Sequence, residues 1–165
     1  MPSERAVANF FHGGITRAPI ARMPDGFRFV ERRTALGAGD TTRDDAVAIV
    51  LAWGVKTRSG FRVRPVTTAV RPGEEYTITL GPIREPVRVE WVDAAGFGYT
   101  TLHGHPLSGE EAFIVEQDSA GAVTFVNRSV SRPASLRWRI LLPLLLLAQA
   151  YFVRRYGREL ARAVR

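Results

Sequence analysis

Between residues 61 and 130, apolar side chains recur at every second position, which is the pattern of half-buried β-strands. Turn-forming sequences such as Arg71-Pro-Gly and Asp118-Ser-Ala-Gly separate the segments that show this pattern. Short connections between strands favour an antiparallel meander. The six predicted strands lie within Phe61–Pro65, Tyr76–Leu80, Val87–Trp91, Phe97–Thr101, Phe113–Val115 and Val123–Phe125.

Two further elements are predicted upstream of this region. An alternating segment that begins at Phe27 predicts a first strand, and Leu36-Gly-Ala-Gly39 is expected to turn the chain after it. A helix is expected from Asp40 to about Trp53, because acidic side chains in its first turns favour the helix dipole. Residues 1–26 are interrupted by glycine and proline and are interpreted as an irregular arm. The expected organisation is therefore one domain, residues 27–165, preceded by this arm.

The longest apolar run, Ile140–Val153, has fourteen residues without a charge. It is shorter than the roughly twenty residues of a membrane-spanning helix and is flanked by arginines, so no transmembrane span is predicted. Pro133 suits the first position of a helix, and Pro143 predicts a kink between residues 139 and 143. A curved sheet must bury its apolar face, and this helix is the expected cover. Its apolar half is therefore predicted to be core or cavity lining.

The net charge of +7 is concentrated at the C-terminal end. Residues 132–165 contain eight arginines and one acid, Glu159, whereas the preceding residues are balanced. Arg154, Arg158 and Arg162 repeat at helical spacing and form either a solvated face or a contact for anionic lipid or another acidic partner. The charge is terminal and is not spread over a face with exposed aromatic residues, which argues against nucleic-acid binding.

The composition excludes some chemistry and suggests a compartment. The chain has no cysteine, so disulfides, thiolate metal sites and cysteine nucleophiles are excluded. The basic residues are 22 arginines and a single lysine, Lys56, a bias typical of a GC-rich bacterial genome. The N-terminal sequence lacks the apolar region of a secretion signal, so a cytoplasmic location is expected.

The most distinctive stretch runs from Phe97 to Gln117. In order, it contains Tyr99, Thr101-Leu102, Gly104-His105, Gly109-Glu110-Glu111 and Phe113. This order resembles the signature of uncharacterised protein family 0548, and the resemblance extends from about Phe27 to the C-terminus. Thr100 departs from it, since the family usually has glycine there.

The family is similar in expected fold to the START-like (SRPBCC) helix-grip superfamily. The strand pattern and this resemblance together predict the α+β class: a curved antiparallel β-sheet of about seven strands gripping a long C-terminal helix. The resemblance brings no established activity.

The alternation within its strand predicts where the side chain of Glu111 points. This residue shares its side of the strand with Phe113 and Val115, so its carboxylate should face the core or the mouth of a cavity. A buried carboxylate must be paired or become protonated. His105 in the preceding turn, Tyr99 on the adjoining strand and Arg132 are the predicted partners.

Two interpretations of Glu111 remain open. It either anchors the hairpin, through backbone amides of the turn or through Arg132, or it forms a ligand-orienting or acid–base pair with His105. His103 and His105 flank a glycine, and this spacing does not make them converge, so no metal site is predicted. No cofactor is expected.

The leading hypothesis is a binding protein that holds a hydrophobic or amphipathic small molecule between the sheet and the terminal helix. The alternatives are a cyclase- or hydrolase-like enzyme using His105 and Glu111, and a peripheral membrane protein that docks through Arg154, Arg158 and Arg162. The predicted ligand-binding residues are Tyr99, His105, Glu111, Phe113, Trp91 and Arg132. The wider predicted lining also includes Trp53, Tyr76, Ile78, Val89, Val115, Phe125, Leu141 and Leu145.

Overall fold

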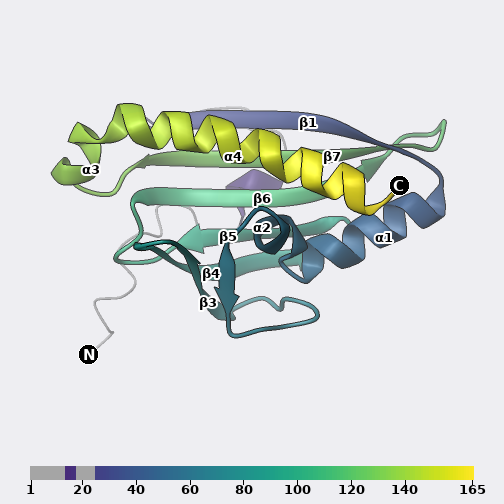
Figure 1. Cartoon of the computed structure of the whole chain (residues 1–165), viewed down its shortest axis with the longest axis horizontal. Coiled ribbons are helices and arrows are strands. Elements are labelled where there is room, and N and C mark those ends of the chain that lie inside the picture. The colour runs from purple at the N-terminus through teal and green to yellow at the C-terminus, as the bar shows by residue number, and fades with distance from the viewer. Residues whose placement is uncertain (1–13, 18–24) are drawn as a thin grey trace.

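The computed structural model of the chain describes residues 14–17 and 25–165. A seven-stranded antiparallel sheet has the order β1-β7-β6-β5-β4-β3-β2, and helices cover one face of it (Figure 1). The elements are η2 (Ile15–Arg17), β1 (Arg28–Ala38), α1 (Asp40–Leu51), α2 (Gly54–Arg58), β2 (Arg62–Arg64), β3 (Glu75–Leu80), β4 (Ile83–Asp93), β5 (Gly96–Thr101), β6 (Leu107–Gln117), β7 (Ala122–Pro133), α3 (Leu136–Ile140) and α4 (Leu142–Ala163).

The sheet confirms the predicted meander of six strands, with β1 added beside β7. Both β6 and β7 extend well beyond the predicted segments and pair from Leu107 opposite Pro133 to Gln117 opposite Val123. Their centres are buried on both faces, so apolar residues such as Ile114 and Val126 interrupt the alternation that marks a half-buried strand. The pattern therefore identified these strands and underestimated their length.

Strand β1 does not end where the sequence suggested. It continues to Ala38 through a register shift between Ala35 and Gly37, so the predicted turn at Leu36 is a bulge inside the strand. The chain turns at Gly39, whose positive φ of 94° suits glycine, immediately before α1 begins.

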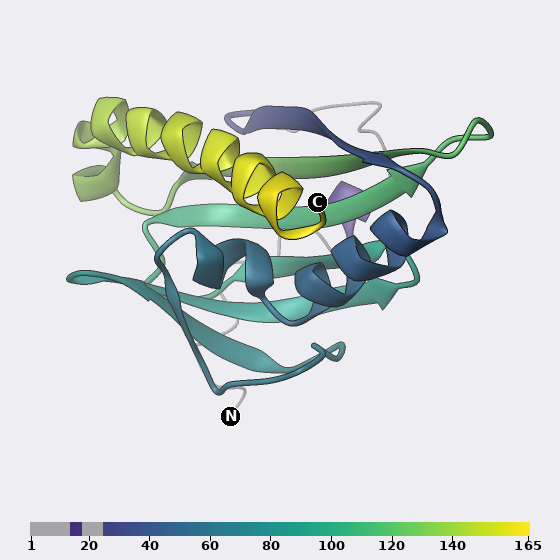
Figure 2. The ribbon, with the colours of Figure 1, turned by 45° about the vertical axis from the view of Figure 1, so that its right-hand side comes forward.

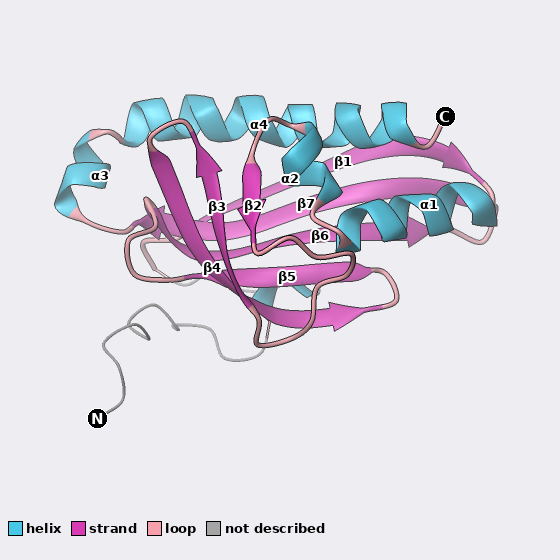
Figure 3. Ribbon diagram, turned by 60° about the horizontal axis from the view of Figure 1, so that its bottom comes forward, coloured by secondary structure: helices cyan, strands magenta, loops and turns pink. Residues whose placement is uncertain are grey.

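Helices α1, α2 and α4 lie on one face of the sheet, here called the inner face (Figures 2 and 3). Helix α1 ends at Leu51, two residues before the predicted end, because Trp53 adopts a left-handed conformation that separates it from α2. The buried indole of Trp53 packs edge-on against Phe97 and Tyr76, with ring centroids 4.8 and 5.2 Å apart. The turn between the two short helices is thus held at the centre of the core.

The terminal helix is broken at Leu141, which divides it into α3 and α4. Pro143 lies in the first turn of α4, so the predicted interruption between residues 139 and 143 is confirmed. Pro133 does not start a helix. It is the last residue of β7, and α3 begins at Leu136.

The prediction that the apolar half of this helix is core or cavity lining holds for one side of the helix only: Leu145, Gln149, Phe152 and Val153 line a cavity, and most of the other residues are exposed. The buried residues of α4 begin at Val153, whereas Leu144 and Leu147 are exposed. Helix α3 and the first turns of α4 lie at the end of the sheet near the end of β7 (Figure 1). None of the helices in the described part of the chain is long and apolar enough to cross a bilayer.

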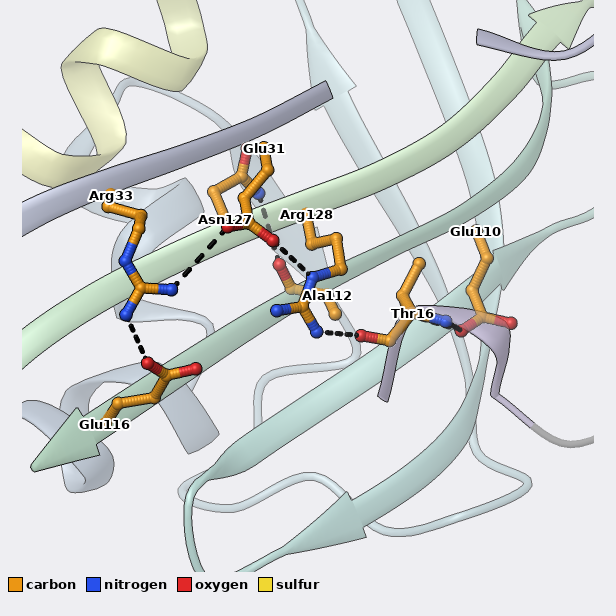
Figure 4. A network of polar contacts seen from close by, with 8 residues as sticks. All are labelled: Thr16, Glu31, Arg33, Glu110, Ala112, Glu116, Asn127 and Arg128. Carbon is orange, nitrogen blue, oxygen red and sulfur yellow. Dashed lines mark hydrogen bonds and ion pairs between the residues drawn. The ribbon is translucent and has the colours of Figure 1, made fainter. Parts of the chain in front are cut away.

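The other face of the sheet, here called the outer face, is covered by η2, which belongs to the predicted arm. Thr16 is buried and donates hydrogen bonds to Glu110 from its backbone N–H and its hydroxyl. The buried Arg128 donates to the carbonyl of Thr16 at 2.9 Å and to Glu31 at 2.7 Å (Figure 4). Residues 14–17 therefore pack as part of the sheet's outer layer. The remaining predicted arm, residues 1–13 and 18–24, lies outside the described residues.

Gly157 allows α4 to approach β1 closely, and its substitution tests this packing. A Cβ at this position would lie 2.8 Å from the Cβ of Thr34. We expect Gly157→Ala to lower the free energy of unfolding by roughly 1–3 kcal/mol, because the added methyl group overpacks the contact. In an exposed helix, by contrast, replacing glycine with alanine stabilises the helix. Chemical denaturation gives the measurement. Thr34→Ala in the same chain should restore part of the loss, and no loss in the single variant would contradict the close approach.

Candidate functional site: a cavity with a buried lysine beneath helix α4

A cavity of about 140 Å³ lies between the inner face of the sheet and the first half of α4. Strands β3 to β7 and helix α2 supply its remaining walls. Its apolar end includes Leu145 and Phe152 of α4. Its polar end is formed by Lys56, Glu85, Tyr99, His105 and Glu111.

Lys56 is the cation at the polar end. It lies in α2 and is buried, with its Nζ 3.2 Å from Glu111 and 3.8 Å from Glu85. The ammonium also lies 4.9 Å from the ring centroid of Phe61 and 5.0 Å from that of Tyr156. Carboxylates and aromatic faces both stabilise a desolvated cation, and together they replace the water that Lys56 has lost.

Glu111 is held by side chains from three other elements. It accepts hydrogen bonds from the hydroxyl of Tyr99 on β5 and from the amide of Asn127 on β7, the latter at 2.9 Å, in addition to its ion pair with Lys56. Burial by itself would raise the pKa of Glu111, but Lys56 and these hydrogen bonds outweigh it and lower the pKa. The carboxylate is therefore ionised and fully engaged.

The cationic state of Lys56 follows from the same contacts. Burial disfavours the charged form, yet the attraction of the carboxylates of Glu111 and Glu85 outweighs it and raises the pKa of Lys56 well above its usual value. Burial and the nearby carboxylates raise the pKa of both tyrosines, so they stay protonated. One ammonium thus faces two carboxylates, and the cluster is acidic overall.

His105 is buried in the turn between β5 and β6, and its Nδ1 accepts a hydrogen bond from the backbone N–H of Leu107 at 2.9 Å. Burial lowers the pKa of His105 and outweighs the attraction of Glu85 and Glu111. The neutral ring therefore carries its proton on Nε2, because Nδ1 acts as an acceptor.

Three of the predicted ligand-binding residues line the cavity: Tyr99, His105 and Glu111. Phe113 faces the same side of β6 but belongs to the packed core beside the cavity, where it contacts Phe97 and Tyr156. Of the wider predicted lining, Leu145 is also at the cavity.

The prediction for Trp91 is wrong. A register shift between Val89 and Trp91 in β4 reverses the parity, so the indole joins the outer-face cluster of Ala112, Ile114 and Val126 and donates to Glu110 at 3.4 Å. A bulge of this kind moves every following side chain to the opposite face.

Arg132 and Leu141 also lie away from the cavity. The guanidinium of Arg132 stacks over the ring of Phe27 at 4.8 Å, and Lys56 takes the position beside Glu111 that was predicted for it. Leu141 is partly exposed at the break between α3 and α4. The other predicted lining residues are packed into the core: Trp53, Tyr76, Ile78, Val89, Val115 and Phe125.

Sequence reasoning missed Lys56, Glu85 and Asn127. A signal existed for Lys56, since it is the only lysine beside 22 arginines and directly follows the apolar end of the first helix. Glu85 and Asn127 carried no comparable signal, because alternating strands place many polar residues at similar positions. No cluster of three or more metal-ligating side chains occurs within residues 14–17 and 25–165.

The seven-stranded antiparallel sheet and the long helix α4 across its inner face form the helix-grip fold that the sequence predicted. Residues 13–159 match the family described as domain of unknown function DUF1990, and the chain belongs to that family.

Two relatives support this assignment, and one solved structure shares the fold. A UPF0548 protein of Deinococcus radiodurans is 45% identical over 75 residues, which span 46% of this chain and only 38% of that protein. A UPF0548 protein of Arabidopsis thaliana is 27% identical over 162 residues and covers 86% of this chain and 78% of its own length. A hypothetical protein of Helicobacter pylori has a similar fold, with a TM-score of 0.64 at 11% identity over 84% of this chain and 88% of that one.

The buried ion pair makes a direct prediction about stability. We expect Lys56→Met to lower the free energy of unfolding by roughly 3–5 kcal/mol at neutral pH, because it leaves Glu111 and Glu85 buried without a cation. Lys56→Met combined with Glu111→Gln should recover part of this loss. Denaturant unfolding measures both, and Arg33→Gln, which removes an exposed ion pair with Glu116, should cost less than about 1 kcal/mol.

The pH dependence follows from the lowered pKa of Glu111. A carboxylate whose pKa is lowered in the folded state stabilises the fold at pH values above its ordinary pKa of 4.5. This stabilisation is lost as the pH falls through the pKa of the folded state. The wild-type protein should therefore lose stability on acidification below that value. Glu111→Gln should weaken this dependence, and an identical acid profile in the variant would contradict the ion-pair assignment.

Proposed function

We propose that this protein binds a small amphipathic molecule in the cavity beneath α4. The observation that carries the proposal is the Oε2 atom of Glu85, which is buried at the cavity, lies 3.8 Å from the ammonium of Lys56 and accepts no hydrogen bond from the described residues. An acceptor left unsatisfied in this way costs free energy, and a ligand with a donor group would remove that cost.

The size of the cavity limits the buried part of the ligand. At about 140 Å³ it is close to the engineered 150 Å³ cavity that binds benzene. Its apolar walls, including Leu145 and Phe152, suit a single ring or a short branched chain. Larger portions of a ligand would extend toward solvent.

The charges at the polar end favour a particular head group. Lys56 is already held between two carboxylates, so it offers little to an anionic ligand. The acidic balance of the cluster, and the Glu85 oxygen that accepts no hydrogen bond, favour a hydroxyl or ammonium group. His105 adds an Nε2 donor that suits a second, accepting atom of the ligand.

The contacts of Glu111 favour binding over acid–base catalysis. Its pKa is lowered, and Lys56, Tyr99 and Asn127 engage its carboxylate, which makes it a weak base. A hydrolase- or cyclase-like role for His105 and Glu111 stays a prediction. It requires that His105→Ala and Glu111→Gln reduce turnover of an identified substrate.

Small aromatic probes test the binding proposal. We expect benzyl alcohol and benzylamine to bind more tightly than benzoate, measured by chemical-shift changes in ¹H–¹⁵N NMR spectra. Leu145→Trp should abolish binding by filling the cavity. Leu144→Trp is the matched control, because the neighbouring Leu144 is 65% exposed and does not line the cavity.

Glu85→Gln tests the head group. In the variant, the ratio of the affinity for benzylamine to the affinity for benzoate should fall roughly tenfold, which corresponds to one charge-assisted hydrogen bond. Binding that survives Leu145→Trp, or a preference that Glu85→Gln leaves unchanged, would refute the site as described. Native mass spectrometry of gently purified protein provides an independent search for a retained ligand.

We also infer a second partner, an anionic lipid surface, for Arg154, Arg158 and Arg162. All three side chains are exposed on α4. Their helical spacing puts them on the side opposite the cavity-lining Phe152 and Tyr156. An exposed row of arginines favours contact with lipid phosphates.

A further inference from the structure

A row of large apolar side chains is exposed along α3 and the first half of α4. Its three members in α4 lie three or four positions apart, its two members in α3 lie four apart, and each is between 51% and 73% exposed. Monomeric proteins seldom expose a contiguous apolar surface without a partner for it. This row, called here the outer apolar stripe, consists of Leu136, Ile140, Leu144, Leu147 and Tyr151.

The stripe is not required by the fold. Leu145, Gln149 and Phe152, on the other side of the same turns, face the cavity, and Gln149 donates to the hydroxyl of Ser129 on β7 at 3.2 Å. These contacts already hold this half of α4 to the sheet. The exposed leucines add nothing to this packing, so another partner must explain them.

The outer apolar stripe continues along α4 into a row of exposed arginines. Tyr151 is followed on the same helix face by Arg154, Arg158 and Arg162, at spacings of three and four. Arg137 and Arg139 in α3 add positive charge at the other end. Residues 132–165 contain only one acid, Glu159, so cations border the apolar stripe at both ends.

We propose that this face of α3 and α4 docks on an anionic lipid bilayer, with the outer apolar stripe inserted at the boundary between head groups and acyl chains. An apolar row bordered by arginines is the pattern of a helix lying in the plane of an interface. Tyr151 lies between the leucines and the arginines, and tyrosine side chains are enriched at the level of the lipid head groups. The inference rests on the lipid contact proposed for the arginines and adds that the leucines insert.

The charge pattern favours a bilayer over a second copy of the chain. A two-fold dimer through this face would bring the same surface of both protomers together. The arginines at each end would then approach arginines of the other copy, which carries only one acid in the region. A surface of lipid phosphates, in contrast, supplies complementary charge along the whole face.

Vesicle sedimentation tests both parts of the inference on the full chain. The wild type should bind vesicles of phosphatidylcholine with about 30% phosphatidylserine more tightly than pure phosphatidylcholine vesicles, in a salt-sensitive manner. Leu144→Gln with Leu147→Gln should reduce the partition coefficient roughly tenfold, because two inserted side chains are lost. Circular dichroism should show unchanged thermal unfolding, since both side chains are exposed.

Charge variants separate insertion from electrostatic contact. Arg154→Gln with Arg158→Gln should weaken binding to the anionic vesicles. The control Arg64→Gln with Arg71→Gln, which removes the same charge near β2 at the opposite edge of the sheet, should have little effect. If only the arginine variant loses binding, lipid contact stands but insertion of the stripe is refuted.

Depth measurements give a second readout. Lipids brominated near the head group should quench the fluorescence that Leu147→Trp adds to that of the three native tryptophans, and should not quench the fluorescence that Leu145→Trp, facing the cavity, adds. Equal quenching of both would refute the orientation. A wild-type dimer that Leu144→Gln with Leu147→Gln dissociates would instead assign the stripe to a second copy and overturn the proposal.

Discussion

The buried ammonium of Lys56 imposes the strictest requirement in this structure. A cation removed from water must meet opposite charge and polarisable groups, and here Glu111, Glu85 and the rings of Phe61 and Tyr156 provide them. These groups come from β6, β4, α4 and the segment after α2, so the charge on α2 ties together elements that are distant in the chain. Any displacement of α2 would leave two carboxylates without their partner.

The short helix α2 explains how the cation reaches this point. Trp53, in a left-handed conformation, ends α1 and packs against the rings of the sheet. The turn that it fixes directs α2, and with it Lys56, toward the inner face. The aromatic core therefore does more than bury apolar area, because it positions the charge that organises the polar end of the cavity.

Both faces of the sheet are occupied, and the two faces use their polar groups differently. On the outer face, Arg128 and Glu110 hold residues 14–17 through hydrogen bonds to the backbone and side chain of Thr16. On the inner face, Lys56, Glu85 and Glu111 form an ion-paired cluster at the wall of a cavity. The outer network thus ties an N-terminal segment to the sheet, whereas the inner cluster borders open space. Helix α4 is likewise two-sided, with the cavity beneath it and the outer apolar stripe above.

The sequence by itself determined the features that depend on local periodicity. Alternation predicted the meander and placed Glu111 and Tyr99 on the inner face, the turn signals located His105, and Pro143 marked the break in the terminal helix. Each of these depends on backbone geometry over a few residues, and the local sequence pattern is sufficient to predict it.

The tertiary structure decided which residues meet. A bulge reversed the face of Trp91, α2 brought Lys56 to Glu111 in place of Arg132, and the apolar run covered the cavity with one side while the other stayed exposed. Register shifts and the partners of a helix face depend on packing between elements far apart in the chain. A pattern read along the chain does not contain that information, because the same apolar stripe suits a core, a cavity or a lipid surface equally well.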